Sequence, residues 1–314
     1  MDLSIVIPLL NESDSLQELH DWVVSVVNKE KLQYEIWFID DGSTDDSWNI
    51  ITKLASQNPC VKGVCFTQNY GKSQALHIGF KKALGVVVIT MDADLQDSPD
   101  EIPALYQMIQ AKGYDLVSGW KKIRHDAVLS KNLPSKLFNA VARLTSGVQL
   151  HDFNCGIKAY HKDVIKNIQV HGEMHRYIPV LAKNAGFSKI GEHIVTHYPR
   201  KYGVTKFGMS RFVYGFLDLI TIFFIGKFSK RPMHFFGGVG TILFLVGFGF
   251  AFYLGIDKLC FHPNGRLIAM RPEFYIALTT MILGTQFFLA GFLGEMLVQQ
   301  KAHKGFYTIK STLS

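Results

Sequence analysis

The stretch "MDADLQD" (91–97) places three carboxylates and one side-chain amide directly after an apolar run. Asp92 and Asp94 are separated by one residue, so in an extended segment both side chains point to the same side. With the amide oxygen of Gln96 they form a hard oxygen site that suits Mg²⁺ or Mn²⁺, completed by water and phosphate. Without a cation the clustered acids would repel each other. Helix capping is the alternative for Asp97, but it explains Asp92 poorly.

Further acids follow other segments of the chain. "DDGSTDDS" begins with Asp40 and Asp41, whose carboxylates can accept hydrogen bonds from a base or a ribose. Turn formation is the alternative, because Asp, Gly and Ser are frequent turn residues. Asp152 precedes the glycine-containing segment "FNCGIK" and is the candidate general base, although it could instead orient a substrate.

A basic segment, "PRKYGVTKFGMSR", brings together Arg200, Lys201, Lys206 and Arg211. Cations in such a loop can neutralise phosphates and a leaving diphosphate. A basic cluster beside a membrane is the alternative, and the two roles are compatible.

The elements that must position these residues alternate along the first part of the chain. Hydrophobic patterning predicts strands at 3–9, 34–43, 61–67, 85–94 and 114–120, with helices at 15–28, 46–57, 72–84 and 98–112. Strands separated by helices of this length indicate a parallel α/β sheet, which binds its ligands at the carboxyl ends of the strands. The acids at 40, 41, 92 and 94 all follow strands.

The last part of the chain differs in composition. Residues 235–256 and 274–294 contain no charged side chain, and each stretch is long enough to cross a bilayer. The sequence therefore predicts a transmembrane hairpin over 233–300, with helices at about 235–256 and 274–297; a buried core helix pair is the alternative. Residues 207–232 are expected to form interfacial amphipathic helices or a helix packed on the globular domain. Residues 1–206 would form the catalytic domain and 301–314 a tail.

Overall composition agrees with a chain that contains membrane-spanning segments. The chain has 314 residues, 48% of them hydrophobic, and a net charge of +7. This charge suits anionic partners, but nucleic acid is disfavoured because the basic residues gather near the apolar segments. The four cysteines match no zinc pattern and are expected to be reduced. No signal peptide precedes the first strand, so the catalytic domain and both ends of the hairpin are expected in the cytoplasm.

Seven motifs in order resemble glycosyltransferase family 2, of the GT-A fold, and especially its polyprenyl-phosphate glycosyltransferases. They are "SIVIPLLNES", "DDGSTDDS", "NYGKSQAL", "MDADLQDSPDEIP", "DFNCGIKAY", "HRYIPVLAKNAG" and "RPMHFFGG". The resemblance implies a hexose carried by a nucleotide-sugar of the UDP-glucose or GDP-mannose type. It implies transfer to undecaprenyl or dolichyl phosphate, with Mg²⁺ or Mn²⁺, at a membrane, most readily the bacterial inner membrane.

The resemblance also implies roles for individual residues. The nucleotide and donor site would comprise Pro8, Asn11, Glu12, Asp40, Asp41, Lys72, Asp92, Arg200 and Lys206. The metal would be held by Asp92, Asp94 and Gln96, and the acceptor phosphate by Lys121, Arg124 and Ser135. Family members often have arginine where Lys121 stands, and lysine lacks the bidentate fork of arginine.

The implied reaction is an inverting displacement, in which a lipid phosphate oxygen attacks the anomeric carbon and the nucleoside diphosphate leaves. The catalytic assignments are Asp152 and Asp94. A processive polysaccharide synthase of the same fold is an alternative, but the chain has no Gln-x-x-Arg-Trp motif. A non-catalytic membrane scaffold is another, although the acids are retained. The sequence leaves a monomer and a homo-oligomer equally open.

Overall fold

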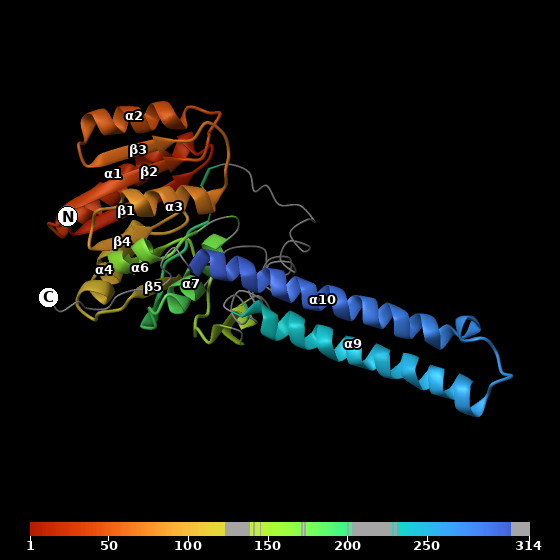
Figure 1. The fold of residues 1–314 in the computed structure, drawn as a ribbon. Coiled ribbons are helices and arrows are strands. Elements are labelled where there is room, and N and C mark those ends of the chain that lie inside the picture. The colour runs from red at the N-terminus through yellow and green to blue at the C-terminus, as the bar shows by residue number, and fades with distance from the viewer. Residues whose placement is uncertain are drawn as a thin grey trace. The chain divides into compact units, whose positions relative to one another are not determined.

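The computed structural model describes residues 1–122, 139–140, 142–144, 146–170, 172, 174–199, 201–202, 228 and 231–302. The chain divides into two compact units (Figure 1). The first is an α/β domain built on one sheet, and the second contains two long helices.

The α/β domain is built on a mixed seven-stranded sheet with the order β3-β2-β1-β4-β6-β5-β7. Its strands are β1 (Leu3–Leu9), β2 (Tyr34–Asp40), β3 (Val61–Cys65), β4 (Val87–Thr90), β5 (Leu116–Trp120), β6 (Lys158–His161) and β7 (Ile190–Ile194). All neighbouring strands are parallel except at β6, which is antiparallel to both β4 and β5. The carboxyl ends of β1, β2 and β4 therefore lie at one edge, as expected.

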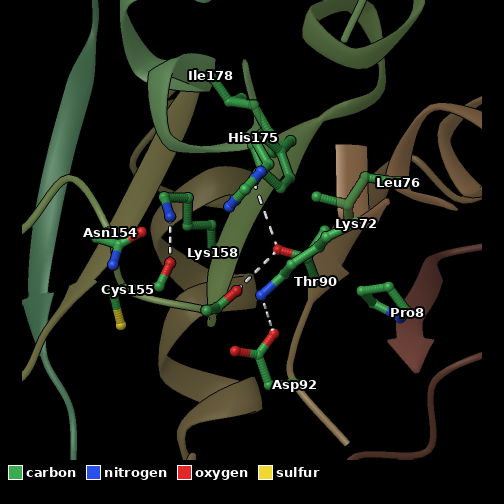
Figure 2. A pocket seen from close by; sticks show the side chains of 12 residues that line it. Pro8, Lys72, Leu76, Thr90, Asp92, Asn154, Cys155, Lys158, His175 and Ile178 are labelled. Atoms are coloured by element: carbon green, nitrogen blue, oxygen red, sulfur yellow. Dashed lines mark hydrogen bonds and ion pairs between the residues drawn. The ribbon is translucent and has the colours of Figure 1, made fainter. Parts of the chain in front are cut away.

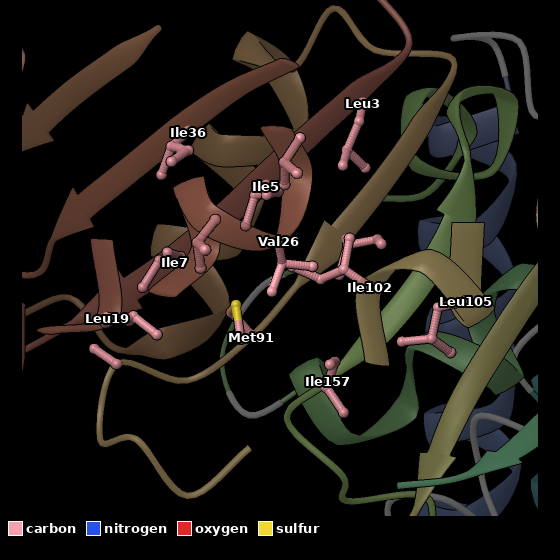
Figure 3. Close-up of a cluster of buried hydrophobic side chains, with 14 of the residues drawn as sticks. Leu3, Ile5, Ile7, Leu19, Val26, Ile36, Met91, Ile102, Leu105 and Ile157 are labelled. Atoms are coloured by element: carbon pink, nitrogen blue, oxygen red, sulfur yellow. The ribbon is translucent and has the colours of Figure 1, made fainter. Parts of the chain in front are cut away.

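Helices cover both faces of the sheet. They are α1 (Ser13–Lys29), α2 (Ser47–Gln57), α3 (Lys72–Lys82), α4 (Ile102–Gln110), α6 (Lys162–Asn167) and α7 (Ile178–Asn184), with 3₁₀ turns η1 (Pro99–Glu101) and η2 (Met174–Tyr177). Ile5 and Ile7 of β1 pack in the cluster that contains Leu19 of α1 (Figure 3), whereas Val6 packs in the cluster that contains Phe80 of α3. This alternation places an apolar layer on each face, so the strands are buried on both sides.

Two strands and one cap depart from the sequence expectations. The hydrophobic pattern did not predict β6 or β7: β6 is only four residues long and begins with a lysine, and two of the five residues of β7 are polar. Asp97 does not cap the helix after Pro99, because the Ser98 hydroxyl accepts the hydrogen bond from the Asp100 backbone N–H at 3.3 Å. Asp97 is therefore left for another role.

The second unit consists of α9 (Pro232–Ile256) and α10 (Pro272–Ala302), joined through η3 (Asp257–Phe261) and η4 (Ile268–Met270). Both helices are long and apolar enough to cross a membrane. In each helix only 17% of an apolar 18-residue stretch is buried. Apolar side chains exposed in this way disfavour the alternative of a buried core pair. Most of the predicted interfacial segment, 207–232, lies outside the described residues and stays a prediction.

Close backbone contact holds the two long helices together. A Cβ atom added at Gly240 of α9 would lie 2.6 Å from the carbonyl oxygen of Gly284 in α10. Small residues allow this approach, which supplies the packing energy that burial of apolar surface cannot supply in lipid. The hairpin therefore depends on glycine at a small number of contact positions.

We expect Gly240→Ala to destabilise the hairpin by about 1–3 kcal/mol, because the added methyl overpacks the contact with α10. Gly249→Ala is the matched control on the same helix, since no atom lies within 4 Å of a Cβ built there. Reversible unfolding of the full-length protein in mixed micelles measures the difference. Equal stability of the two variants would contradict the packing described for Gly240.

Candidate active site

An open groove of about 300 Å³ lies at the carboxyl ends of β1, β2 and β4. The residues from the sequence prediction that line it are Pro8, Glu12, Asp41, Lys72, Asp92 and Asp94. A second, smaller cavity of about 20 Å³ adjoins it and shares Pro8, Lys72 and Asp92 (Figure 2). The structure thus brings together six residues from four separate parts of the sequence.

Asp92 and Asp94 follow β4 in a tight turn. The turn contains Leu95 in the left-handed region, at φ 58°, and the backbone N–H of Gln96 donates to Asp94 Oδ1 at 3.2 Å. Asp92 forms an ion pair with Lys72 from the first turn of α3. Burial opposes ionisation of Asp92, but Lys72, with help from Lys121, outweighs it and lowers the pKa of Asp92 to about 2. Asp92 is therefore a carboxylate at neutral pH.

The donor set fits a hard divalent cation. Asp92 and Asp94 both line the groove, and oxygen ligands of this kind suit Mg²⁺ or Mn²⁺. Within the described part of the chain, no group of three or more His, Cys, Asp or Glu side chains is arranged to hold a metal ion. Two carboxylates would leave the remaining coordination positions to water and substrate phosphate, as is usual for Mg²⁺.

Asp97 forms a buried ion pair with Lys121. Their charged atoms are 2.7 Å apart, and the side chains are only 1% and 14% exposed. Burial disfavours the charged lysine, but Asp97 outweighs that effect and raises the pKa of Lys121. Lys121, predicted to bind an acceptor phosphate, is thus held by a carboxylate in this structure. Arg124 and Ser135, predicted to act with it, lie outside the described residues.

The residues after β7 are tied to the same acidic segment. The backbone carbonyl of Gln96 accepts hydrogen bonds from the Tyr198 N–H at 2.8 Å and interacts with His197 Nδ1 at 3.1 Å. The predicted basic loop begins directly after this segment, but Arg200 and Lys206 lie outside the described residues.

Asp40 and Asp41 brace the loops around the groove. Asp40 Oδ1 accepts a hydrogen bond from the Ser43 N–H at 2.8 Å. Asp41 accepts from the backbone N–H groups of Tyr70 and Gly71, at 2.7 and 2.9 Å, and so fixes the loop that leads into α3. Asn11 Oδ1 accepts from the Thr44 N–H at 2.8 Å. The loops after β1, β2 and β3 therefore form one connected wall.

Asp152 is 1% exposed and is held from several sides. Its Oδ1 accepts the Asn154 N–H at 3.1 Å, and its own N–H donates to Glu192 Oε1 at 3.0 Å. Glu192 also interacts with His151, whose ring stacks on Trp120 with the centroids 4.1 Å apart. Sequence reasoning missed Glu192, because it predicted no strand at β7.

Sequence reasoning assigned no role to Lys158 and His175, which line the small cavity (Figure 2). Lys158 Nζ donates to the backbone carbonyl of Cys155, and burial lowers the pKa of Lys158. His175 Nδ1 lies 3.1 Å from the Ser73 hydroxyl. Burial and then Lys72 lower the pKa of His175 to about 3, so the ring is neutral at pH 7. Both residues lie in quoted motifs, but those motifs did not indicate their positions.

Comparison with known proteins identifies the domain and its relatives. The family model described as Glycosyl transferase family 2 matches residues 4–169. Dodecaprenyl-phosphate galacturonate synthase of Rhizobium johnstonii is 34% identical over 95% of this chain and 88% of its own length. Undecaprenyl-phosphate 4-deoxy-4-formamido-L-arabinose transferase of Klebsiella pneumoniae (strain 342) is 33% identical over 94% of this chain and 88% of its own.

A solved structure supports the fold. Glucosyl-3-phosphoglycerate synthase from Mycobacterium tuberculosis, crystallised with Mn²⁺, uridine diphosphate and phosphoglyceric acid, superposes with a TM-score of 0.54. The match covers 71% of this chain and 78% of that chain, at 18% identity. A likeness at this identity speaks for the GT-A fold alone.

We expect the stability of the α/β domain to fall as the pH drops from about 6.5 toward 3, in part because of His175. Its pKa is near 6.5 when unfolded and about 3 when folded, so the unfolded chain binds more protons in this range. The slope from one such group is at most about 1.4 kcal/mol per pH unit.

His175→Gln should flatten this pH dependence, since glutamine does not titrate. Thermal unfolding of the full-length protein in detergent at pH 7, 6 and 5 measures it, with His234→Gln, a change in the second unit, as control. An unchanged slope in His175→Gln would contradict the neutral state of His175.

Proposed function

The chain belongs to glycosyl transferase family 2, and we propose that it transfers a sugar from a nucleotide-sugar to a polyprenyl phosphate at the membrane. One observation carries this proposal: the carboxylate groove and two helices able to cross a membrane occur in one chain. A lipid-linked acceptor accounts for both features, because its phosphate must reach the groove while its hydrocarbon chain stays in the bilayer. The two named relatives carry polyprenyl phosphates in their names.

Donor binding is assigned to the wall of the groove. The loops braced by Asp40, Asp41 and Asn11 would contain the nucleoside, with Pro8 and Glu12 on the same surface. Asp92 and Asp94, with Gln96, would hold Mg²⁺ or Mn²⁺ and, through it, the donor diphosphate. The bound ion would neutralise charge on the departing nucleoside diphosphate. Arg200 and Lys206 are proposed to add positive charge there.

Acceptor binding is assigned to Lys121, together with Arg124 and Ser135. Lys121 is paired with Asp97 in the structure, so an incoming phosphate would compete with that carboxylate for the lysine. The phosphate oxygen forms the new bond to the anomeric carbon while the bond from that carbon to the diphosphate oxygen breaks, which inverts the centre.

Asp152 is proposed to orient the acceptor or to act as a base. Its backbone is fixed by Glu192 and its carboxylate by the Asn154 N–H, which suits a group of defined position. A polyprenyl phosphate is already anionic near neutral pH, so orientation is sufficient for the reaction.

The sugars in the names of the two relatives differ from those expected from the resemblance. The relatives are named for galacturonate and for 4-deoxy-4-formamido-L-arabinose, neither of which is the glucose or mannose expected from the resemblance. The nucleotide-sugars tried as donors in a transfer assay must therefore include those of uronic acids and of amino sugars.

We further propose that the catalytic domain faces the cytoplasm from a bacterial inner membrane. The retained carboxylates of the groove argue against a non-catalytic scaffold.

The test is transfer of radiolabelled sugar to extracted polyprenyl phosphate by the purified full-length protein. We expect a lipid-linked product with at least one donor, and only with Mg²⁺ or Mn²⁺ present. Asp94→Ala should lower kcat/KM by about 100-fold or more, because charge stabilisation by a metal contributes several kcal/mol.

Asp100→Asn is the matched control, since Asp100 is an exposed carboxylate in the same segment and interacts with Trp22. Its activity should stay within about twofold of the wild type. No lipid product with any donor would exclude the proposed function. Full activity of Asp94→Ala would exclude the metal assignment.

A further inference from the structure

Lys72 forms an ion pair with Asp92, one of the two carboxylates of the proposed metal site. Figure 2 shows its side chain directed at Asp92, and the ion pair joins Lys72 Nζ to Asp92 Oδ1. The two side chains are 36% and 32% exposed, so solvent and ligands in the groove can reach the pair. An ion pair at this level of exposure is weak enough to be exchanged.

The other oxygen of Asp92 faces the protein. A Cβ atom built on Gly156 would lie 2.6 Å from Asp92 Oδ2, so this side of the carboxylate packs against the Gly156 backbone. A cation that enters from the groove therefore meets Asp92 at Oδ1, the atom paired with Lys72. Lys72 and a bound metal ion would then compete for this oxygen.

The place of Lys72 in the fold also indicates a second, anionic partner. Lys72 is the first residue of α3, after Gly71 at φ 95°, which has no side chain to cap the helix; the Asp41 carboxylate accepts the Gly71 N–H just before this end. Helix N-termini carry partial positive charge, which disfavours a cation there and favours an anion such as a diphosphate. A negative group beside Lys72 therefore stabilises the lysine at this position.

We propose that Lys72 exchanges between two partners: it holds Asp92 in the ligand-free protein and releases it when a nucleotide diphosphate binds the lysine. The lysine then neutralises phosphate, and Asp92 becomes available to the divalent cation. Nucleotide and metal therefore bind cooperatively, beyond the direct contact between them. Linkage requires that each raises the affinity for the other by the same factor. This inference rests on the proposed function for the presence of a diphosphate.

The test measures Mn²⁺ binding by electron paramagnetic resonance, with full-length protein in detergent and no sugar or lipid. Lys72→Met should bind Mn²⁺ about tenfold more tightly than the wild type, equivalent to about 1.4 kcal/mol. Lys53→Met is the matched control, because it removes the same charge from an exposed position on α2. Its affinity should equal that of the wild type. Lys72→Gln provides a second variant of the site.

A double-mutant cycle separates exchange from simple repulsion. In an Asp92→Asn background the lysine has lost its partner, so adding Lys72→Met should change the Mn²⁺ affinity by less than about twofold. A tenfold gain that persists in this background would show that Lys72 only repels the ion, and would overturn the proposal. Wild-type or weaker Mn²⁺ affinity in Lys72→Met would overturn it as well.

Uridine diphosphate is the probe for the second half of the exchange. It should tighten Mn²⁺ binding in the wild type more than in Lys72→Met, and equal coupling in both would contradict the proposal. The lipid-transfer assay is separate from these measurements. Sugar transfer to lipid together with unaltered Mn²⁺ binding in Lys72→Met would exclude the exchange and leave the proposed function standing. The predicted Mn²⁺ and uridine diphosphate results without any lipid product would exclude the proposed function and leave the exchange at the carboxylate groove standing.

Discussion

Neutralisation of the carboxylates that follow β4 is the constraint on which the site depends. Asp92 and Asp97 both lie beside the Gly156 backbone, where two bare negative charges would be costly. Lys72 pairs with Asp92 and Lys121 with Asp97, so the ligand-free protein supplies its own cations. A metal ion and two phosphates, one from the donor and one from the acceptor, would redistribute these same charges. On the proposed function, the ion pairs of the ligand-free protein hold in place the charged groups that would meet these ligands.

The rest of the domain serves to place these charges. Parallel pairing of β1, β2 and β4 aligns their carboxyl ends, and apolar clusters on both faces fix the strands. The loops that follow these strands are connected by side chains that accept hydrogen bonds from backbone N–H groups, as Asp41 does. In the second unit the packing is different in kind, because backbone contact at Gly240 replaces the burial of apolar surface.

Sequence patterns predicted those parts of the molecule that depend on local spacing. The five strands, the paired acids Asp92 and Asp94, and the two apolar helices follow from periodicity and composition. The ion pair of Asp97 with Lys121 could not be predicted in this way, because the two residues meet only through tertiary structure. The same holds for the contact of Glu192 with the backbone of Asp152. Ser98 and the neighbouring Asp97 could each cap the helix that begins at Pro99, and the sequence alone did not show which of them does.

We propose that Asp92 exchanges Lys72 for a divalent cation when a nucleotide diphosphate binds. Anomalous diffraction at the manganese edge, from crystals of the full-length protein with Mn²⁺ and uridine diphosphate, would locate both the ion and the lysine. We expect one anomalous peak beside Asp92 and Asp94, with the Lys72 ammonium on a phosphate oxygen. A manganese peak elsewhere, or Lys72 still paired with Asp92 beside the bound ion, would contradict it.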